Sequence, residues 1–287
     1  MLTLLTADRL VGWGLQKMYF SQKSGERYSI TYALDSTHAD LLIFGSSRAS
    51  HHYIPTVFKD SLQLTCFNTG KDGEGISYNY ALLLGIVSRY KPSYILLDIS
   101  EGSFYKKRAS PDNLVAFMPY FNTGHSALRE IVVKRNQFEK LKLFSAIYPY
   151  NSTLISSLKG INNNQPDNLS GYLPLYGHLN IGTLPVLSNQ SKNEIDSDKI
   201  EDLTNFIHVC KSYHIRLYIL QSPVFMIESN GPAFAVLNNL LVNEGVPFFN
   251  FSGYLNTSDY FKDAAHLNNE GAQLYSKMLA GLIKNRH

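Results

Sequence analysis

This 287-residue chain has little of what marks several classes of protein. It contains two cysteines, Cys66 and Cys210, which are too few for a disulfide framework or a cysteine zinc site. Both lie in apolar stretches, where we expect small buried side chains. Charged residues make up 17% of the chain and the net charge is +3, so the sequence indicates no nucleic-acid partner. Hydrophobic residues make up 44%, which is enough for a sizeable core and excludes wholesale disorder.

The N-terminal region also lacks an apolar run long enough to cross a membrane. Residues 1–7 are apolar, but they fall short of the roughly 20 residues of a membrane span and lack the basic lead of a signal peptide. Between Leu10 and Phe20, apolar residues recur at near-helical spacing. One interpretation is an amphipathic helix that packs on the domain. The sharper hypothesis is that residues 1–35 are the helical stub of a removed membrane anchor or signal outside the given chain.

Five short apolar runs are continuous rather than alternating, which is typical of buried parallel strands. They cover residues 40–44, 64–68, 94–99, 215–221 and 247–251. Helical patterns separate or follow most of them, at 78–90, 198–213, 232–243 and 269–284. Strands that alternate with helices predict βαβ units, and hence a parallel sheet with helices on both faces.

The connection between the third and fourth predicted strands is unusually long. It exceeds a hundred residues, whereas a βαβ unit needs only roughly 30. The surplus, residues 103–194, contains a predicted helix over 127–144 and loops rich in aromatic and amide side chains. Connections of this length often form lids or binding elements. We expect the insert to shape a substrate site, and the alternative is that it simply covers one face of the sheet.

Two elements far apart in the chain carry groups suited to nucleophilic chemistry. The first predicted strand runs into Gly45-Ser46-Ser47-Arg48, at the edge where open α/β sheets bind ligands. Taken alone, a serine there is more simply a helix cap. Asp263 and His266 stand three apart just before the last helix. A histidine can take the proton of a serine while a carboxylate fixes its tautomer, so Ser47, His266 and Asp263 are candidates for a catalytic triad.

Three blocks of the sequence resemble the SGNH, or GDSL-type, hydrolase superfamily. The strand followed by Gly-x-Ser matches Gly45-Ser46-Ser47, and N-x-G-x-x-G after the second strand matches Asn68-Thr69-Gly70-Lys71-Asp72-Gly73. The last block, D-x-x-H-L-N-x-x-G, matches Asp263 through Gly271. The resemblance spans residue 40 to the C-terminus, with the exception of the insert.

The resemblance implies a role for each matched residue. Ser47 is the nucleophile, His266 the base and Asp263 its partner. The backbone N–H groups of Ser47 and Gly73 donate to the oxyanion. Such a site needs no metal and no cofactor. The resemblance also implies a single domain over residues 1–287, with a three-layer α/β/α, flavodoxin-like fold and a five-stranded parallel sheet in the order 2-1-3-4-5.

One block departs from the family pattern. The third strand normally ends in G-x-N-D, whose asparagine adds an oxyanion donor, whereas this chain has Gly102 at that position. Either Asn122 or Lys71 replaces the donor, or stabilisation of the transition state is weaker, since one lost donor can cost ~10²–10³ in rate. The departure resembles a divergent branch that includes teichoic-acid D-alanylation and alginate-acetylation proteins of bacterial envelopes.

Three residues near the nucleophile are candidates for substrate contacts: Arg48, Lys71 and Asp72. Arg48 either meets an anionic substrate or pairs with a carboxylate such as Asp72 or Glu101. His51 and His52 follow the nucleophile turn, but adjacent histidines point to different faces and lack metal-ligand spacing. We therefore predict no metal site.

The expected function is hydrolysis of a small acyl ester, such as acetyl on a carbohydrate, through an acyl-enzyme at Ser47. Two alternatives stay open. The first is an envelope glycan O-acyltransferase or an accessory protein for acyl transfer. The second is a non-catalytic glycan-binding protein on a decayed hydrolase fold, which Gly102 permits. The resemblance to envelope proteins predicts a location in the bacterial cell envelope or periplasm, with or without a membrane anchor.

Overall fold

The computed structural model describes residues 2–106, 114–135, 139–153, 169–183, 194–226 and 231–285. The chain divides into two compact units, and the single domain with an insert over 103–194 stays a prediction. Residues 1–37, 81–90 and 110–168 make up the first unit, and residues 38–80, 91–109 and 169–287 make up the second. The N-terminal helices and most of the insert therefore belong to the same unit.

The second unit contains a parallel sheet of five strands. Its order is β2-β1-β3-β4-β5, and all four neighbouring pairs run parallel. Each strand is one or two residues shorter than the apolar run that predicted it. The predicted fold class, strand number and strand order are confirmed. The strands are β1 (Leu41–Phe44), β2 (Cys66–Asn68), β3 (Tyr94–Asp98), β4 (Arg216–Gln221) and β5 (Phe248–Asn250).

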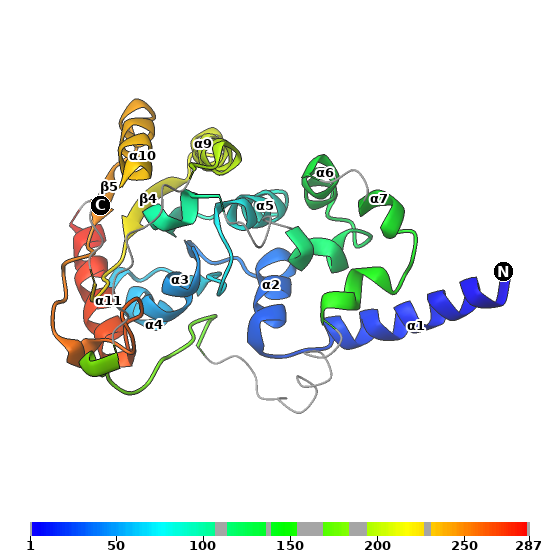
Figure 1. The fold of residues 1–287 in the computed structure, drawn as a ribbon, viewed down its shortest axis with the longest axis horizontal. Helices are drawn as coiled ribbons and strands as arrows, with labels where there is room; N and C mark the ends of the chain where they lie inside the picture. Colours follow the sequence, from blue (N-terminus) through cyan, green and yellow to red (C-terminus); the bar gives the residue numbers. More distant parts are fainter. Residues whose placement is uncertain are drawn as a thin grey trace. The chain divides into compact units, whose positions relative to one another are not determined.

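Helices cover both faces of this sheet because alternate strand residues point to opposite sides. Leu41 and Ile43 of β1 belong to the cluster that packs against α3 (Ser47–His52), α4 (Pro55–Leu62) and α11 (Asn269–Lys284). Phe44 points the other way, and its ring meets the edge of Phe206. Phe206 belongs to α9 (Ser197–Ser212), which lies with α10 (Pro232–Asn243) on that side of the strands (Figure 1).

Most predicted helices occur close to their expected bounds. The patterns over 232–243 and 269–284 correspond to α10 and α11, and that over 198–213 to α9. The pattern over 78–90 corresponds to α5 (Ile76–Val87), which starts and ends earlier. The predicted insert helix over 127–144 is present as α6 (Ser126–Arg135) and α7 (Glu139–Lys142), with residues 136–138 outside the described part. Short 3₁₀ turns complete the second unit: η1 (Glu101–Phe104), η4 (Ile181–Thr183) and η5 (Ser258–Tyr260).

The first unit is helical, and aromatic side chains form its centre. It contains α1 (Leu2–Phe20), α2 (Gly25–Asp35), α6, α7, η2 (Leu114–Tyr120) and η3 (Tyr148–Thr153). Tyr120 is fully buried, hydrogen-bonds Thr31 at 2.6 Å and packs edge-on against Tyr19. Contacts between residues this far apart in the sequence hold α1 and α2 to the insert. Among the described residues, no helix is long and apolar enough to span a membrane.

Two glycines of α11 give a test of packing at the end of the sheet. A Cβ on Gly271 would lie 2.2 Å from the carbonyl oxygen of Tyr260, whereas a Cβ on Gly281 would meet nothing within 4 Å. We expect Gly271→Ala to lower the free energy of unfolding by about 1–3 kcal/mol. Gly281→Ala should raise it by roughly 0.5–1 kcal/mol, because alanine favours helix. Urea unfolding measures both changes, and equal effects would contradict this packing.

Candidate active site

Ser47 stands at the first turn of α3, directly after β1. Gly45 makes the connection with φ +147°, a conformation that favours glycine. A Cβ there would also lie 2.8 Å from the carbonyl oxygen of Asp98. The Gly45 N–H donates to Oδ1 of Asn79 at 3.1 Å, which fixes the turn. Ser47 is therefore presented at the carboxyl edge of the sheet, between the ends of β1 and β3.

The fold brings Ser47, His266 and Asp263 together. Ser47 Oγ lies 2.7 Å from His266 Nε2, and His266 Nδ1 lies 3.0 Å from both carboxylate oxygens of Asp263. A carboxylate only accepts hydrogen bonds, so Nδ1 carries the proton and donates to it. In the neutral ring Nε2 is then an acceptor, and the Ser47 hydroxyl donates to it. This arrangement can deprotonate a serine hydroxyl.

Asp263 also holds the loop that carries the histidine. Its Oδ1 accepts hydrogen bonds from the backbone N–H groups of Ala265 at 2.8 Å and His266 at 2.9 Å. Partial burial would raise the pKa of Asp263, but these N–H groups and the imidazole outweigh it, and the pKa lies below its usual value. Asp263 is therefore ionised at neutral pH, as an acceptor for His266 must be.

The loop after β2 is fixed to α3 by Asn68. Its buried Nδ2 donates to the carbonyl oxygens of Ala49 at 2.7 Å and Tyr53 at 3.0 Å, and its Oδ1 accepts from the N–H of Gly70 at 2.9 Å. A Cβ on Gly70 would lie 2.4 Å from the backbone nitrogen of Ser50. The asparagine and first glycine of this block thus act in packing the loop against the nucleophile helix.

The two predicted oxyanion donors have uncommitted backbone N–H groups. Neither the N–H of Ser47 nor that of Gly73 has a hydrogen-bond acceptor within the described ranges of the chain. Gly73 has φ +78°, and a Cβ there would meet nothing within 4 Å. These N–H groups are available to an anionic oxygen.

A small recess lies beside Ser46, where the loops after β1, β2 and β3 meet. It has room of about 10 Å³, enough for a water-sized group. Gly102 lies between two of its lining residues, Ser100 and Ser103, and is not itself among them. Three serines and an asparagine are among its lining residues, which are Ser46, Glu74, Gly75, Ile76, Asn79, Leu97, Asp98, Ile99, Ser100 and Ser103.

The two residues considered as replacement donors are Lys71 and Asn122. Lys71 forms an ion pair with Glu74 at 3.6 Å. Asn122 belongs to the first compact unit and not to the one that holds Ser47. Neither lines the recess beside Ser46.

Arg48 requires a correction. Of the two alternatives, pairing with a carboxylate holds, but the partner is Asp98 at 3.1 Å and not Asp72 or Glu101. It also donates to the carbonyl oxygen of Ile99 at 2.8 Å, and the residue is only 7% exposed. The side chain turns inward because α3 places it over the end of β3. A buried and paired guanidinium is a structural group, so we no longer expect Arg48 to bind substrate.

Asp72 pairs with His51 next to the triad. His51 Nε2 lies 3.1 Å from Asp72 Oδ2, and His51 Nδ1 lies 2.6 Å from the carbonyl oxygen of Leu173. Both neighbours are acceptors, so both ring nitrogens must donate, and the geometry fits the imidazolium. The His51 ring stands edge-on to that of His266, with centroids 5.6 Å apart. The sequence analysis assigned no role to His51, because adjacent histidines point to different faces and lack metal-ligand spacing.

The pKa values of this pair follow from the same contacts. Burial lowers the pKa of His51, but the hydrogen bonds with Asp72 and Leu173 and the charge of Asp72 outweigh it, and the net pKa is raised. Mainly because of its hydrogen bond with His51, the pKa of Asp72 falls to about 2. The pair is ionised over a wide pH range.

The end of the insert, residues 169–180, lies along α3 and the start of α11. The N–H of Leu173 donates to the carbonyl oxygen of Ser50 at 2.9 Å, and the N–H of Asn269 donates to that of Leu175 at 2.7 Å. The N–H of Asn68 donates to the carbonyl oxygen of Ser170 at 2.9 Å, at the edge of β2. This segment borders the site through His51, while the substrate-shaping role of the whole insert stays a prediction.

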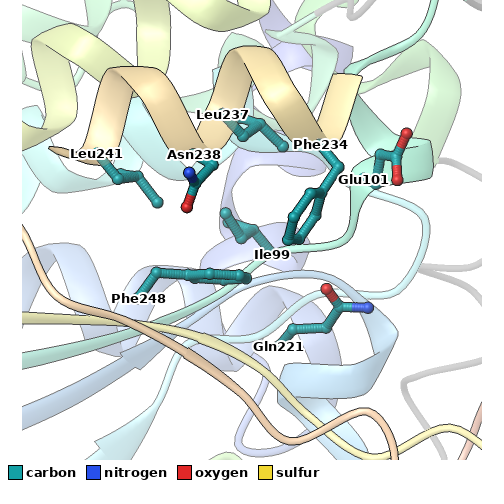
Figure 2. A pocket seen from close by; sticks show the side chains of 8 residues that line it. All are labelled: Ile99, Glu101, Gln221, Phe234, Leu237, Asn238, Leu241 and Phe248. Carbon is teal, nitrogen blue, oxygen red and sulfur yellow. The ribbon is translucent and has the colours of Figure 1, made fainter. Parts of the chain in front are cut away.

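A second cavity lies beneath α10 and is mainly apolar. Figure 2 shows Phe234 and Leu237 of α10 above Ile99 and Phe248, with Gln221 at the lower edge. Its room of about 10 Å³ holds at most one water, so it is a packing gap and not a substrate site. The described ranges also contain no cluster of three or more His, Cys, Asp or Glu residues arranged to hold a metal.

The comparisons with known proteins gave distant structural likenesses. No protein-family model matches it. No curated protein matches it either. A candidate lipolytic protein of the G-D-S-L family from Desulfitobacterium hafniense DCB-2 is 10% identical over 84% of this chain and 98% of its own, with a TM-score of 0.42.

Two further solved structures are similar. A candidate acylhydrolase from Bacteroides fragilis NCTC 9343 is 11% identical over 86% of this chain and 88% of its own, with a TM-score of 0.38. A candidate platelet activating factor from Streptococcus pneumonia is 14% identical over 97% of this chain and 98% of its own, with a TM-score of 0.43. Likenesses this distant assign no activity, so the interpretation of the site depends on its own geometry.

The His51–Asp72 pair predicts a pH-dependent stability. Folding raises the pKa of His51, so the protonated ring stabilises the folded state. This stabilisation is fully present below the ordinary histidine pKa of about 6.5 and is lost as the pH rises through the pKa of His51 in the folded state. We expect His51→Gln to lower the Tm by about 2–4 °C at pH 5.5, equivalent to roughly 1 kcal/mol in a domain of this size. The difference should shrink toward pH 9.

The matched control is His208→Gln, because the His208 imidazole is 55% exposed and pairs with Glu244 at the surface. It should change the Tm by less than His51→Gln does at each pH. Thermal unfolding followed by circular dichroism measures both variants. A His51→Gln effect that grows toward alkaline pH would contradict the ionised pair.

Proposed function

We propose that this protein is a serine ester hydrolase of the SGNH type. One observation carries the proposal: the hydrogen-bond chain from Ser47 Oγ through His266 to Asp263, with the proton of the neutral ring on Nδ1. The same three residues stand in the sequence blocks that resemble that superfamily. An uninterrupted chain at 2.7 Å and 3.0 Å also speaks against a decayed, purely binding role.

The proposed mechanism has two halves. Ser47 Oγ attacks the acyl carbon while its proton moves to His266 Nε2, and the carbonyl electrons form an oxyanion. The oxyanion accepts from the N–H groups of Ser47 and Gly73. The C–O bond to the alcohol then breaks, and His266 returns the proton to the departing oxygen. A water, deprotonated by His266, releases the acid from the acyl-enzyme and restores the Ser47 hydroxyl.

The recess beside Ser46 is our candidate for the donor that Gly102 does not supply. Ser46 and Ser100 are among its lining residues, and it has room for a water-sized group. A serine hydroxyl, or a water held between these serines, can donate a hydrogen bond to the oxyanion. We favour this placement over Lys71 and Asn122, which do not line the recess.

For the substrate we propose a small acyl group, such as acetyl, on a carbohydrate hydroxyl. The recess beside Ser46 holds at most one water, so it leaves no room there for a long acyl chain. Tyr176, in the segment 169–180, is 69% exposed, and an exposed aromatic ring is suited to stack on a sugar. Transfer of the acyl group to a glycan acceptor is the same chemistry with a sugar hydroxyl in place of water.

We further propose that the protein acts at the cell envelope, at a membrane surface. Large apolar side chains of α1 are at least half exposed, namely Leu2, Leu4, Leu10, Val11 and Trp13. The basic residues Arg9 and Lys17 lie on the same helix, whereas its one acidic residue, Asp8, accepts from the Ser145 hydroxyl at 2.6 Å. An apolar helix surface with basic side chains suits an anionic lipid surface.

Ser47→Ala tests the proposed nucleophile. The wild-type chain should react with a fluorophosphonate probe and release acetate from acetylated xylan, and Ser47→Ala should lose the labelling and at least ~10³ of the rate. Ser212→Ala, at the exposed end of α9, is the matched control and should retain both. Mass spectrometry locates the label. A wild-type chain that stays unlabelled would overturn the proposal, and added acceptor sugar separates hydrolysis from transfer.

Sedimentation with lipid vesicles tests the envelope location. We expect binding to phosphatidylglycerol vesicles and weaker binding to phosphatidylcholine vesicles, because the anionic lipid attracts Arg9 and Lys17. The double variant Leu10→Ser, Trp13→Ser should bind at least about tenfold more weakly, because both replaced side chains are exposed and apolar. Val242→Ser, an exposed apolar position on α10, is the control. Equal binding by all three chains would contradict a role for α1.

A further inference from the structure

His52 is buried at the end of α3 and makes two side-chain hydrogen bonds. Its Nδ1 lies 2.9 Å from the hydroxyl oxygen of Ser222, just beyond the end of β4. Its Nε2 lies 3.0 Å from the backbone nitrogen of Leu267. The residue is completely buried. His52 therefore joins the nucleophile helix, the edge of the sheet and the loop of His266.

The protonation of His52 follows from these partners. The backbone N–H of Leu267 is an obligatory donor, so His52 Nε2 must accept and carries no proton. The ring proton is then on Nδ1 and is donated to Ser222 Oγ. Burial lowers the pKa of His52 well below its usual value, and the charges of Arg48 and the neighbouring histidines act in the same direction. His52 is neutral, in a defined tautomer.

The contact to Leu267 acts one residue away from the base of the triad. His266 and Leu267 share a peptide unit, so a hydrogen bond that fixes the Leu267 N–H also fixes the backbone plane that follows His266. The rings of His52 and His266 stand edge to face, with centroids 6.2 Å apart. Asp263 restrains the imidazole and the N–H of His266 from the opposite side of this loop.

Ser222 extends the connection into the sheet. Its backbone N–H donates to Asp98 Oδ2 at 3.2 Å, and Asp98 pairs with Arg48, the residue after the nucleophile. One buried polar series therefore begins beside His266 and ends beside Ser47. It consists of the Leu267 N–H followed by the side chain of His52, then Ser222, Asp98 and Arg48. Each of these contacts is within 3.2 Å.

We propose that His52 is a positioning residue, whose Nε2 holds the peptide after His266 so that the base stays within hydrogen-bond reach of Ser47. The proposal deepens the ester hydrolase function and rests on it. The hydrogen bonds of the His52 ring go to Ser222 and Leu267, so it acts through the loop of His266. A shift of the base by about 1 Å can cost ~10² in rate.

Two isosteric variants test the role of Nε2. In His52→Gln the side-chain carbonyl can take the place of Nε2 and accept from Leu267. In His52→Asn the amide reaches only the place of Nδ1, beside Ser222. We expect His52→Asn to lower kcat for a nitrophenyl acetate about 10²-fold with KM changed less than about threefold. The kcat of His52→Gln should be at least about tenfold higher than that of His52→Asn. Fluorophosphonate labelling of Ser47 should slow in the same order.

Ser276→Ala is the matched control for stability. Ser276 Oγ donates to the carbonyl oxygen of His52 at 3.2 Å and accepts from the N–H of Ile54 at 3.0 Å, at the same buried junction but away from His266. It should lower the Tm as His52→Asn does while leaving kcat within about twofold. If kcat falls in proportion to the loss of Tm in His52→Gln, His52→Asn and Ser276→Ala, the role of His52 is purely structural and the proposal is overturned.

Equal kcat in His52→Gln, His52→Asn and the wild-type chain would overturn it as well. Failure of the hydrolase function looks different, since neither nitrophenyl acetate nor the fluorophosphonate then reacts at Ser47 in the wild-type chain. If one of the two His52 variants does not fold, the fluorophosphonate labelling rate of the other is compared with that of Ser276→Ala. This comparison still separates a positioning role from a purely structural one.

Discussion

The buried ion pair between Arg48 and Asp98 is the interaction on which the geometry of the site depends. Their side chains are 8% and 1% exposed, so removing either partner leaves a charge in the core at a cost of about 3–5 kcal/mol. Asp98 ends β3 and also accepts from the Tyr53 hydroxyl and the Ser222 N–H. The pair therefore fixes the rotation of α3 over the sheet, and that rotation decides where Ser47 points.

A single short helix gives this site most of its contacts. Along Ser47–His52 the side chains point in turn to the base, to the core and to the loop after β2. In a helix, neighbouring residues lie about 100° apart, so six residues can meet partners from several separate elements. The loops that carry Asp72 and His266 each make a contact with this helix. The precision of the site thus comes from many small restraints on one rigid element.

The strands and the last two helices were predictable because their signals are local. Continuous apolar runs mark buried parallel strands, Pro232 starts α10, and Asn268 caps α11 by accepting from Gly271. The partner of Arg48 was not predictable, since several carboxylates were in range and only packing selects Asp98. His51 and His52 carry no pattern in sequence, and their partners lie in loops distant along the chain. The N-terminal helices and the insert were predicted as separate parts because the contacts that join them, such as that of Tyr120 with Thr31, link residues far apart in the sequence.

The segment 169–180 has a consequence for how this protein can change. β2 is an edge strand, and such edges pair with other chains unless something covers them. Here the carbonyl oxygen of Ser170 accepts a hydrogen bond from the N–H of Asn68. Gly171 lies so close that a Cβ on it would be 2.0 Å from the carbonyl oxygen of Asn68. The residues that border the reaction centre are thus also the cap of the sheet. Exchanging this segment would expose the edge of β2, so a change beside the site would also change the resistance of the sheet to aggregation.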